Sequence, residues 1–479
     1  MDQIKEYGMT SDDKTEGLKK GLVYIFIANA ITLGLSLLTG FVLPKVLSVP
    51  TYAKIKDFSL YTSYIGVLHL GYLDGLYLTY GGKKLSDISD REMSICRTNT
   101  FLLQALMAVG FAAAGMLLQE PLIFIFALCL IPENVATLYK NLYQATGEFG
   151  RYSNILNLKS VMTLICYVVL LFIVKTDNYI PYVLVYLFLM VVMWAGLEWE
   201  IRRRFGFKLH LEASFRNLKE NISSGIVLML GNFSSTLMTS LDRWFVKGLL
   251  LTEDFAYYSF AVSMESLINT FVIPVTTTLY NFLCQVTDVL RIRKIKTICL
   301  IFSLYMISSA FPVKFILEHF LTKYEASTMV MFILFSTQVL YMIIKGVYIN
   351  VYKARKQQDL YLKQLIIVII LGAVFNTLFY LWMGSNEGIA LGTLCSVICW
   401  YLICMRSVPE LNASFSENLL MALGITIFLL CGYFLSSIVG FVVYTVIITL
   451  LCLALDRNAF AETIRMGKDM VIGKLKKRR

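Results

Sequence analysis

Residues 29–53 read NAITLGLSLLTGFVLPKVLSVPTYA, and residues 232–256 read NFSSTLMTSLDRWFVKGLLLTEDFA. The two stretches lie 203 positions apart, and each carries four polar residues at spacings of 3, 4 and 3, which places the four on one helix face. These residues are Asn29, Thr32, Ser36 and Thr39 in the first stretch and Asn232, Ser235, Thr239 and Asp242 in the second. At the same offset, Tyr52-Ala53 corresponds to Phe255-Ala256. The chain therefore resembles itself.

A second self-match supports a duplication. It has an offset of 209, close to the first, and it follows two helices that occupy equivalent places in the two halves. Its residues are Tyr139, Asn141, Tyr143, Ala145 and Tyr152 in the first half and Tyr348, Asn350, Tyr352, Ala354 and Tyr361 in the second. Two matches at nearly equal offsets favour a genuine internal repeat over coincidence.

The composition indicates that the repeated units consist of membrane-spanning helices. Of 479 residues, 57% are hydrophobic and 16% are charged, whereas about 25% are charged in a soluble domain. A membrane-spanning helix needs about 20 apolar residues. This composition excludes a soluble enzyme, a disulfide-stapled secreted module and a disordered scaffold. Apolar runs between charged or Pro/Gly breaks predict fourteen spans, at 20–43, 54–80, 95–118, 121–144, 155–175, 180–199, 222–246, 255–284, 297–317, 327–350, 363–383, 388–405, 418–436 and 439–455.

The distribution of Lys and Arg predicts the orientation. If the N-terminus is cytoplasmic, the segments on the inner side hold 34 of the 43 Lys and Arg residues, as the positive-inside rule requires. Both termini are then cytoplasmic. The net charge of +11 reflects orientation and contact with anionic membrane lipid, notably at the basic tail 474–479. Nucleic-acid binding is not needed to explain it.

Combining repeat and spans gives an all-α polytopic membrane protein with 14 transmembrane helices. Each repeat has six spans, so both repeats start on the same side and are parallel, with a cleft between two lobes. We expect an N-lobe at 1–200 (spans 1–6), a cytoplasmic linker at 201–221, a C-lobe at 222–408 (spans 7–12), and spans 13–14 with the basic tail at 409–479.

Several short motifs carry a family resemblance over residues 18–455. They are Asn29 followed by Gly40-Phe41 and Pro44, Gly71-Tyr72-Leu73-Asp74-Gly75 with Tyr80-Gly81, Ala145 with Tyr152, and Asp242-Arg243. With the two six-span lobes and the extra helix pair, the chain resembles polysaccharide (O-antigen or capsule repeat-unit) flippases of the multidrug/oligosaccharidyl-lipid/polysaccharide exporter superfamily. The resemblance implies a multidrug-and-toxin-extrusion-like fold, alternating access, a bacterial cytoplasmic membrane, and an undecaprenyl-pyrophosphate-linked oligosaccharide as substrate.

A pyrophosphate group entering an apolar medium needs cationic or polar partners at membrane depth. Arg243 and Lys247 stack at i and i+4 in span 7 and form a candidate phosphate clamp, unless both extend to the outer surface. Lys345 lies inside span 10 and is a further candidate. Asn29 and Asn232, from the polar faces of spans 1 and 7, complete the expected substrate-binding residues.

Four carboxylates within spans are candidates for coupling transport to a proton or Na⁺: Asp74, Glu133, Asp242 and Glu265. Glu133 and Glu265 lie nearest the midplane, one in each lobe. For both, an interhelical hydrogen bond or ion pair is the structural alternative. Asp74 could instead fix the glycine-rich turn of span 2. Asp242 and Arg243 point about 100° apart on a helix, so we do not expect them to be mutual partners.

The remaining residues narrow the function. Ten cysteines lie mostly in apolar runs and three histidines are far apart, so we expect no metal site, disulfide or cofactor. No nucleotide-binding loop, nucleophile elbow or zinc motif suggests an enzyme. The alternatives are a multidrug cation antiporter, a peptidoglycan-precursor lipid flippase and, less favoured, a polysaccharide polymerase or glycosyltransferase. We expect a monomer that can associate with polysaccharide assembly proteins.

Overall fold

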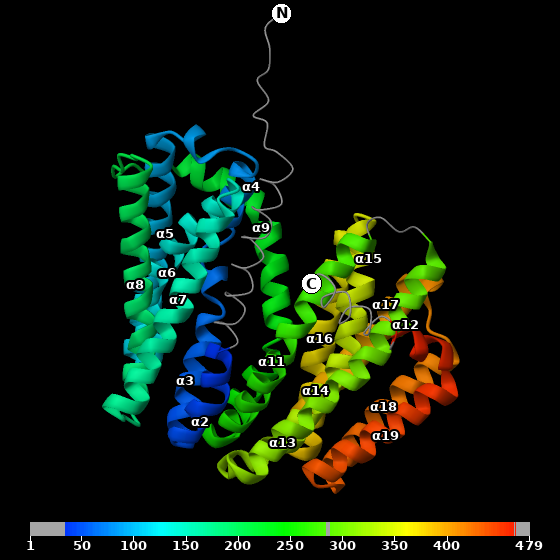
Figure 1. The fold of residues 1–479 in the computed structure, drawn as a ribbon. Coiled ribbons are helices and arrows are strands. Elements are labelled where there is room, and N and C mark those ends of the chain that lie inside the picture. The colour runs from blue at the N-terminus through cyan, green and yellow to red at the C-terminus, as the bar shows by residue number, and fades with distance from the viewer. Residues whose placement is uncertain (1–33, 284–287, 464, 466–479) are drawn as a thin grey trace, which may run out of the picture. The chain divides into compact units, whose positions relative to one another are not determined.

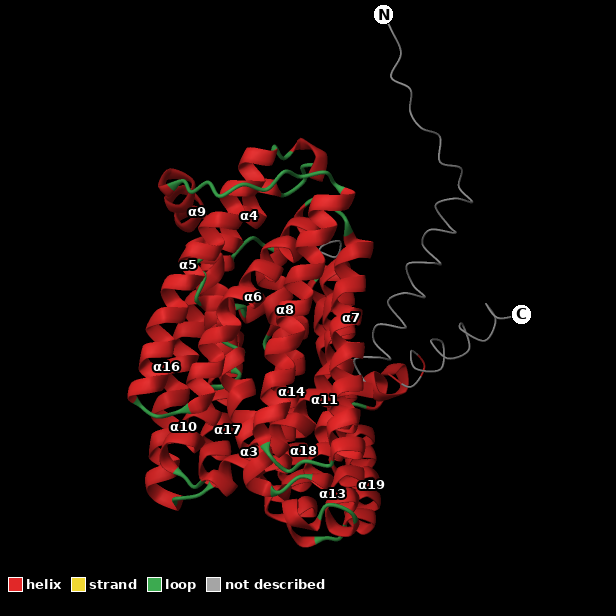
Figure 2. Cartoon of the chain, turned by 90° about the vertical axis from the view of Figure 1, so that its left-hand side faces the viewer, coloured by secondary structure: helices red, strands yellow, loops and turns green. Residues whose placement is uncertain are grey.

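The structure is a computed structural model, and it describes residues 34–283, 288–463 and 465. This part of the chain is helical and contains no β-strand, and its helices are joined by short loops (Figures 1 and 2). Asn29, most of the span expected at 20–43 and the basic tail at 474–479 lie outside the described residues. Nothing structural is therefore added to these three predictions.

The chain divides into two compact units. Unit 1 comprises Met1–Val46 and Lys54–Phe233, and unit 2 comprises Leu47–Ala53 and Ser234–Arg479. The boundary after Phe233 falls inside a helix, α9. The expected division into two lobes, a linker at 201–221 and a last helix pair remains a prediction. In unit 1 the helical elements are η1 (Leu38–Val42), α2 (Leu43–Val46), α3 (Val49–Thr62, whose first residues count with unit 2), η2 (Ile65–Val67), α4 (Tyr72–Tyr80), η3 (Leu85–Asp87), α5 (Asp90–Leu117), α6 (Pro121–Ala145), α7 (Phe149–Val168), η4 (Val169–Val174), α8 (Tyr179–Arg204) and most of α9 (Phe215–Met238).

Unit 2 is built around one helix that is buried on every side. Each residue of α14 from 330 to 343 is buried, because α11, α12, α13, α17 and α18 pack around this helix. The elements of unit 2 are α10 (Leu241–Leu249), α11 (Thr252–Leu283), α12 (Val289–Met306), η5 (Ile307–Ser309), α13 (Ala310–His319), η6 (Thr322–Ser327), α14 (Thr328–Ile343), η7 (Ile344–Tyr348), α15 (Ile349–Ala354), α16 (Gln358–Met383), α17 (Asn386–Ser407), η8 (Pro409–Leu411), α18 (Phe415–Phe434) and α19 (Ser437–Leu455).

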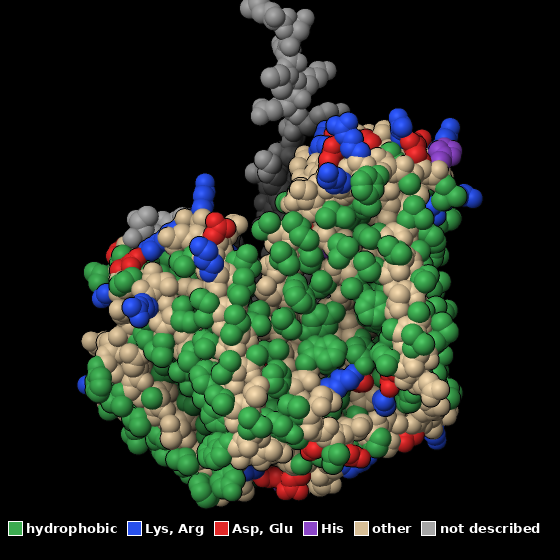
Figure 3. Space-filling view, turned by 180° about the vertical axis from the view of Figure 1, so that it is seen from behind, with side chains coloured by type: hydrophobic (Ala, Val, Ile, Leu, Met, Phe, Trp, Pro, Cys, Tyr) green, Lys and Arg blue, Asp and Glu red, His purple; other side chains and the backbone are tan. Residues whose placement is uncertain are grey.

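Most expected spans are found as helices. Among the described residues, ten helices are long and apolar enough to cross a membrane, and a bent pair raises the number to as many as 11. They correspond to the spans expected from 95 to 246 and from 297 to 455. The span expected at 255–284 falls within α11. The multi-pass helical fold is thus confirmed, whereas the total of 14 spans and the repeat remain predictions. On the face shown in Figure 3, each unit has a hydrophobic flank and its charged side chains gather mainly at the ends.

The span expected at 54–80 is not one helix. It is divided into α3, the short η2 and α4, and the chain turns at Leu70 and Gly71, whose φ angles are 51° and 84°. A left-handed backbone conformation ends a helix, and glycine adopts it without steric cost. The turn sets α4 against the first half of α9. There the backbones are so close that a Cβ atom on Gly75 would lie 1.9 Å from the Asn221 carbonyl oxygen.

The expected linker is an ordered part of unit 1. Its segment 205–214 has no regular secondary structure, and side chains of α5 bind its backbone. The Ser94 hydroxyl accepts a hydrogen bond from the His210 N–H at 3.0 Å. The Asn99 side chain accepts one from the Ser214 N–H and donates one to the Ser214 carbonyl, at 3.1 and 2.9 Å. This segment thereby fixes the start of α9.

Candidate functional site

The local structure of α9 and α10 creates the site. The span expected at 222–246 consists of these two helices, which are bent by 53° relative to each other. Before the bend, the Thr239 hydroxyl donates to the Ser235 carbonyl at 3.2 Å and the Ser240 hydroxyl donates to the Thr236 carbonyl at 2.7 Å. Hydroxyls that bond to the carbonyl four residues earlier often bend helices. A new helix start is thus placed just before Asp242 and Arg243.

A cavity of about 200 Å³ opens beside this helix start, within unit 2. Four ionisable side chains line it: Asp242, Arg243, Glu265 and Lys345. The sequence had singled out all four, and they come from three separate stretches of the chain. The other lining residues are Met238, Thr239, Val262, Ser266, Asn269, Leu334, Thr337, Gln338, Tyr341 and Thr393. With two carboxylates and two basic groups, the cavity is balanced in formal charge when all four are ionised.

Asp242 is held by two hydrogen bonds. Its Oδ2 atom accepts one from the Tyr258 hydroxyl at 2.7 Å, and its Oδ1 atom accepts one from the Arg243 backbone N–H at 2.8 Å. The Asp242 side chain forms no ion pair with the Arg243 side chain in the described structure, as expected from their different directions on the helix. Asp242 lies in the first turn of α10, where the helix dipole stabilises a negative charge.

Glu265 lies opposite polar groups of α14. Its Oε1 atom accepts a hydrogen bond from the Gln338 side-chain amide. Gln338 is 1% exposed, and its own Oε1 atom lacks a hydrogen-bond partner in the described structure. The structure therefore leaves one buried acceptor of the Gln338 side chain for a ligand or a water molecule.

The two cations of the cavity are not neutralised by direct ion pairs. The Lys345 ammonium lies 4.3 Å from the centre of the Tyr341 ring, a cation–π geometry. It forms no ion pair within the described residues, and neither does Arg243, whose Nε atom is buried without a hydrogen-bond partner. Both cations are available to an anionic group.

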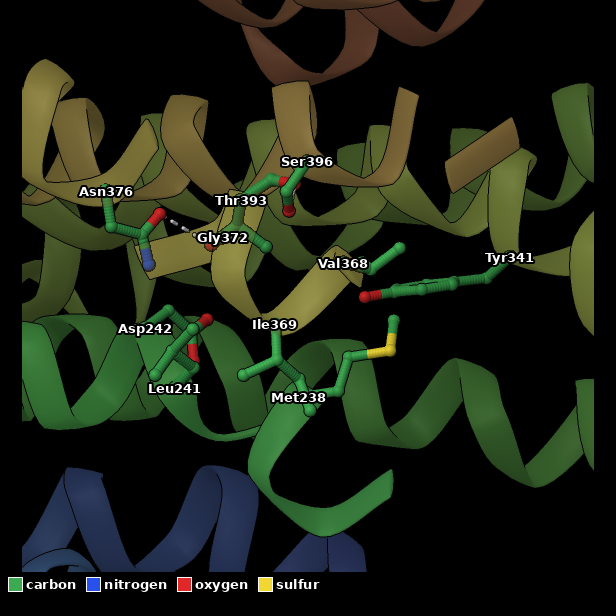
Figure 4. Close-up of a pocket in the computed structure, with 10 residues that line it drawn as sticks. All are labelled: Met238, Leu241, Asp242, Tyr341, Val368, Ile369, Gly372, Asn376, Thr393 and Ser396. Carbon is green, nitrogen blue, oxygen red and sulfur yellow. Dashed lines mark hydrogen bonds between the residues drawn. The ribbon is translucent and has the colours of Figure 1, made fainter. Parts of the chain in front are cut away.

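A smaller pocket of about 10 Å³ adjoins the cavity and shares Met238, Asp242, Tyr341 and Thr393 with it. This volume is close to what one water molecule needs. Figure 4 shows Asp242, Asn376 and Thr393, from α10, α16 and α17, around this pocket. The Thr393 hydroxyl donates to the Asn376 Oδ1 atom at 3.4 Å. Oxygen atoms from three helices thus converge on a space the size of one water or one small ion.

The other residues selected from the sequence lie elsewhere. Lys247 is half-buried on α10, 5.5 Å from the Trp244 ring centre, and is not part of the cavity lining. Asn232 is exposed on the part of α9 that belongs to unit 1. The Asp74 Oδ2 atom lies 3.8 Å from the His69 Nε2 atom, beside the turn at Gly71. Of the eight selected residues that the structure describes, four therefore line one cavity: Asp242, Arg243, Glu265 and Lys345.

Glu133, in unit 1, lies between two lysines. Its carboxylate is 3.6 Å from the Lys140 ammonium and 3.5 Å from the Lys159 ammonium, and it accepts a 3.1 Å hydrogen bond from the Tyr186 hydroxyl. The structure thus contains the interhelical ion pair that was the structural alternative for this residue. Glu265, by contrast, has no cation within ion-pair distance in the described residues.

Several polar residues of the site were not predicted from the sequence. Tyr258, Gln338 and Asn376 contact or line the space around Asp242 and Glu265. Gln338 and Asn376 interrupt apolar runs, and this signal was available because a polar side chain within a membrane span usually faces the protein interior. No group of three or more His, Cys, Asp or Glu residues in the described structure is arranged to hold a metal ion.

Comparisons with known proteins support the family resemblance. Residues 95–284 match the family model described as "Polysaccharide biosynthesis protein". The sequence has no significant match among curated proteins. The lipid II flippase MurJ, solved in an inward closed conformation, is 12% identical with a TM-score of 0.60, over 91% of this chain and 99% of that chain.

A multidrug resistance transporter of the MATE family of the MOP superfamily, in an inward-facing conformation, is also 12% identical. Its TM-score is 0.52, over 79% of this chain and 95% of the transporter. At such low identity, these likenesses show a shared fold. Together with the family match, they confirm the resemblance inferred from the sequence: the chain is a multi-pass helical membrane protein with the fold of this transporter superfamily, and residues 95–284 match polysaccharide biosynthesis proteins.

Proposed function

We propose that the protein translocates undecaprenyl-pyrophosphate-linked oligosaccharide repeat units across the bacterial cytoplasmic membrane by alternating access. The family match at residues 95–284 supports a role in polysaccharide synthesis. The fold shared with two transporters supports translocation rather than catalysis. In this proposal both termini are cytoplasmic, as the distribution of Lys and Arg predicts.

The observation that carries the proposal is the cavity with Arg243 and Lys345 in unit 2. An ionised group in an apolar membrane protein is costly and is usually functional. No carboxylate lies at ion-pair distance from either basic group in the described structure, so both can pair directly with an anionic ligand. Arg243 can bind phosphate oxygens in a bidentate manner, and Lys345 can add a point charge. In our proposal they bind the pyrophosphate while the polyprenyl chain stays in lipid.

Asp242 and Glu265 supply the proposed ion coupling. Asp242 adjoins the small pocket whose size fits one water or one ion, and oxygen ligands are what a hard cation requires. Glu265 shares the larger cavity, so binding of a proton or Na⁺ there would change the charge that the substrate meets. Glu133 is already compensated by two lysines, which favours a structural role for it over ion coupling.

One observation favours a second candidate, a multidrug cation antiporter. The cavity has as many carboxylates as basic groups, and a cationic drug could therefore pair with Asp242 or Glu265. A peptidoglycan-precursor flippase would use the same cations as the proposed function, because its substrate also carries a pyrophosphate. A polymerase or glycosyltransferase gains no support from the cavity, because both of its carboxylates already accept hydrogen bonds from neighbouring groups.

The test uses proteoliposomes loaded with lipid-linked oligosaccharide and a glycosidase added outside. Exposure of the sugar should depend on the protein and should fall at least about tenfold in Arg243→Ala and in Lys345→Ala. Lys353→Ala is the matched control, because Lys353 is exposed on α15 and is not part of the cavity. Lipid II in a parallel assay distinguishes the two lipid substrates. Efflux of a cationic dye without exposure of sugar would overturn the proposal in favour of the antiporter.

A further inference from the structure

A groove between α7 and α8 of unit 1 is separate from the site described above. It has a volume of about 620 Å³. Its lining is apolar for most of its length and comes from the first turns of α7 and the last turns of α8, namely Ile155, Leu158, Val192, Met193, Gly196, Leu197 and Trp199. The remaining lining residues are charged and lie towards the end of α8: Glu200, Arg203 and Arg204.

At Gly196 no side chain fills the groove. A Cβ atom added to this glycine would meet no atom within 4 Å. Glycine in the middle of a helix is unfavourable by itself, and here it leaves room where any other side chain would project into the groove. Beside it, Leu158 and Trp199 are 52% and 64% exposed. The groove therefore presents apolar walls around a free channel.

The length of the groove fits one leaflet. From Val192 to Arg203 the helix rises about 16 Å, at 1.5 Å per residue. One leaflet contributes about half of the 30 Å hydrocarbon thickness of a bilayer. With the arginines at the headgroup level, Trp199 lies one turn deeper, at the boundary where tryptophan is enriched in membrane proteins. The groove thus has the depth that an acyl chain occupies.

The charged end is basic and has one unused cation. Glu200 pairs with Arg151, and its Oε1 atom lies 3.8 Å from Arg204 Nη1. Arg203 is exposed and forms no ion pair or hydrogen bond within the described structure. Arg151 also pairs with Glu148 at 3.1 Å, so it adds no net charge here. Among the lining residues, two guanidinium groups meet one carboxylate, and this end carries a net charge of +1. Guanidinium groups bind phosphate oxygens in a bidentate manner.

We propose that this groove binds one anionic phospholipid, with an acyl chain along Gly196 and the headgroup phosphate on Arg203 and Arg204. The polyprenyl tail of the transported substrate is the competing occupant. The phospholipid is favoured because the groove carries its own cations at headgroup level and reaches only about one leaflet deep. The inference does not depend on the proposed transport function.

Native mass spectrometry of the detergent-purified protein tests the inference. We expect the wild type to retain one dioleoyl-phosphatidylglycerol at least tenfold more tightly than dioleoyl-phosphatidylcholine. Arg203→Gln/Arg204→Gln should remove this preference and leave phosphatidylcholine binding unchanged. The control is Arg216→Gln/Lys219→Gln, which removes two exposed charges of unit 1 away from the groove and should keep the preference.

A second pair of variants tests the apolar channel. Gly196→Leu should fill the groove and lower retention of phosphatidylglycerol at least fivefold without disturbing the fold. Gly110→Leu is the control, because Gly110 is equally open on α5 but lies outside the groove. Equal retention of phosphatidylglycerol by the two double variants, or by the two leucine variants, would overturn the proposal. So would displacement of phosphatidylglycerol by undecaprenyl phosphate at a tenth of its concentration, which would assign the groove to the substrate tail.

Discussion

The hydroxyl of Tyr258 donates a 2.7 Å hydrogen bond to the Oδ2 atom of Asp242, sixteen positions earlier in the chain. Both residues are buried, and the other carboxylate oxygen already accepts the N–H of Arg243. The side chain of Asp242 is therefore held in one orientation before any ion or substrate arrives. Tyr258 is therefore a positioning residue: it orients the Asp242 carboxylate but does not itself line the cavity.

Tyr258→Phe should lower both stability and transport. The substitution removes one hydrogen bond to a buried carboxylate, which costs about 1–3 kcal/mol of unfolding free energy. We expect transport driven by an imposed Na⁺ or proton gradient to fall by about fivefold or more. Thermal unfolding in detergent and gradient-driven transport in proteoliposomes measure the two effects.

Tyr257→Phe is the matched control for this change. Its hydroxyl makes no hydrogen bond in the described structure, although its ring packs against Tyr324 at a centroid distance of 5.9 Å. The control should keep wild-type transport. Equal transport by the two variants would show that the orientation of Asp242 is not set by Tyr258.

The two midplane carboxylates should respond differently to neutralisation. Glu133→Gln leaves two lysines without their shared carboxylate, in a site where the three side chains are 13%, 19% and 31% exposed. Breaking such a cluster costs about 2–4 kcal/mol, a little less than for a fully buried pair. Glu265→Gln removes a carboxylate that has no ion-pair partner within the described residues, so its effect on stability should be small.

For ion-coupled transport, Glu265→Gln should have the larger effect and Glu133→Gln the smaller one. Glu265→Gln should abolish the dependence of transport on the imposed ion gradient, whereas folded Glu133→Gln should keep it. Replacing Lys159 with Gln in the Glu133→Gln background should recover part of the stability, because it removes one uncompensated cation. Full gradient dependence in Glu265→Gln would rule out this residue as the coupling site.

The sequence predicted the positions of helices and of unusual charges because both leave a local signal. Apolar runs indicate spans, and a charged residue inside such a run is conspicuous. Asp242, Arg243, Glu265 and Lys345 were selected in this way, and they meet in one cavity. In each half, two of the three matched tyrosines of the second repeat segment are fully buried: Tyr139 and Tyr143 in unit 1, and Tyr348 and Tyr352 in unit 2.

Which residues pair between helices, and where the helices bend, were not predicted. Lys140 and Lys159 lie near the inner ends of the expected spans 121–144 and 155–175, and they were counted with the Lys and Arg residues of the inner side. Their long side chains nevertheless reach Glu133. Similarly, Leu70 adopts a positive φ of 51°, which no hydropathy pattern reveals. At the bend after α9, Ser235 and Thr239 were interpreted only as part of a polar helix face, and Thr236 and Ser240 were not singled out.

Gly225 should be intolerant of even one added methyl group. A Cβ atom on this residue would lie 2.1 Å from the Gly71 carbonyl oxygen, where α9 crosses α4. Gly225→Ala must separate the two helices, and overpacking of this kind costs about 3 kcal/mol. Gly231→Ala on the same helix meets no atom within 4 Å and should gain about 0.5–1 kcal/mol from the higher helix propensity of alanine. Thermal unfolding of the two variants should move in opposite directions, and a shared direction would contradict the tight crossing.

Lys314 should attach the last helix pair, α18 and α19, to the rest of unit 2. From α13, its ammonium donates to the carbonyls of Gly432 and Leu435 at 2.7 and 2.6 Å, at the end of α18. The last carbonyl groups of a helix lack N–H partners within the helix and form the negative end of the helix dipole. A cation that binds them is therefore stabilising. Lys314→Met should therefore cost about 2–3 kcal/mol locally. Hydrogen exchange should rise in residues 430–440 and stay unchanged in α14.

Glu318→Gln is the control for Lys314→Met, because it removes the carboxylate partner of Lys314 and keeps the two carbonyl partners. Glu318, whose Oε1 atom lies 3.8 Å from the Lys314 ammonium, also accepts a 2.6 Å hydrogen bond from the Ser437 hydroxyl. If the carbonyl contacts dominate, Glu318→Gln should change exchange at 430–440 much less than Lys314→Met does, because Gln can still accept from Ser437. Equal exchange in the two variants would mean that the ion pair, and not the helix end, attaches α18 and α19.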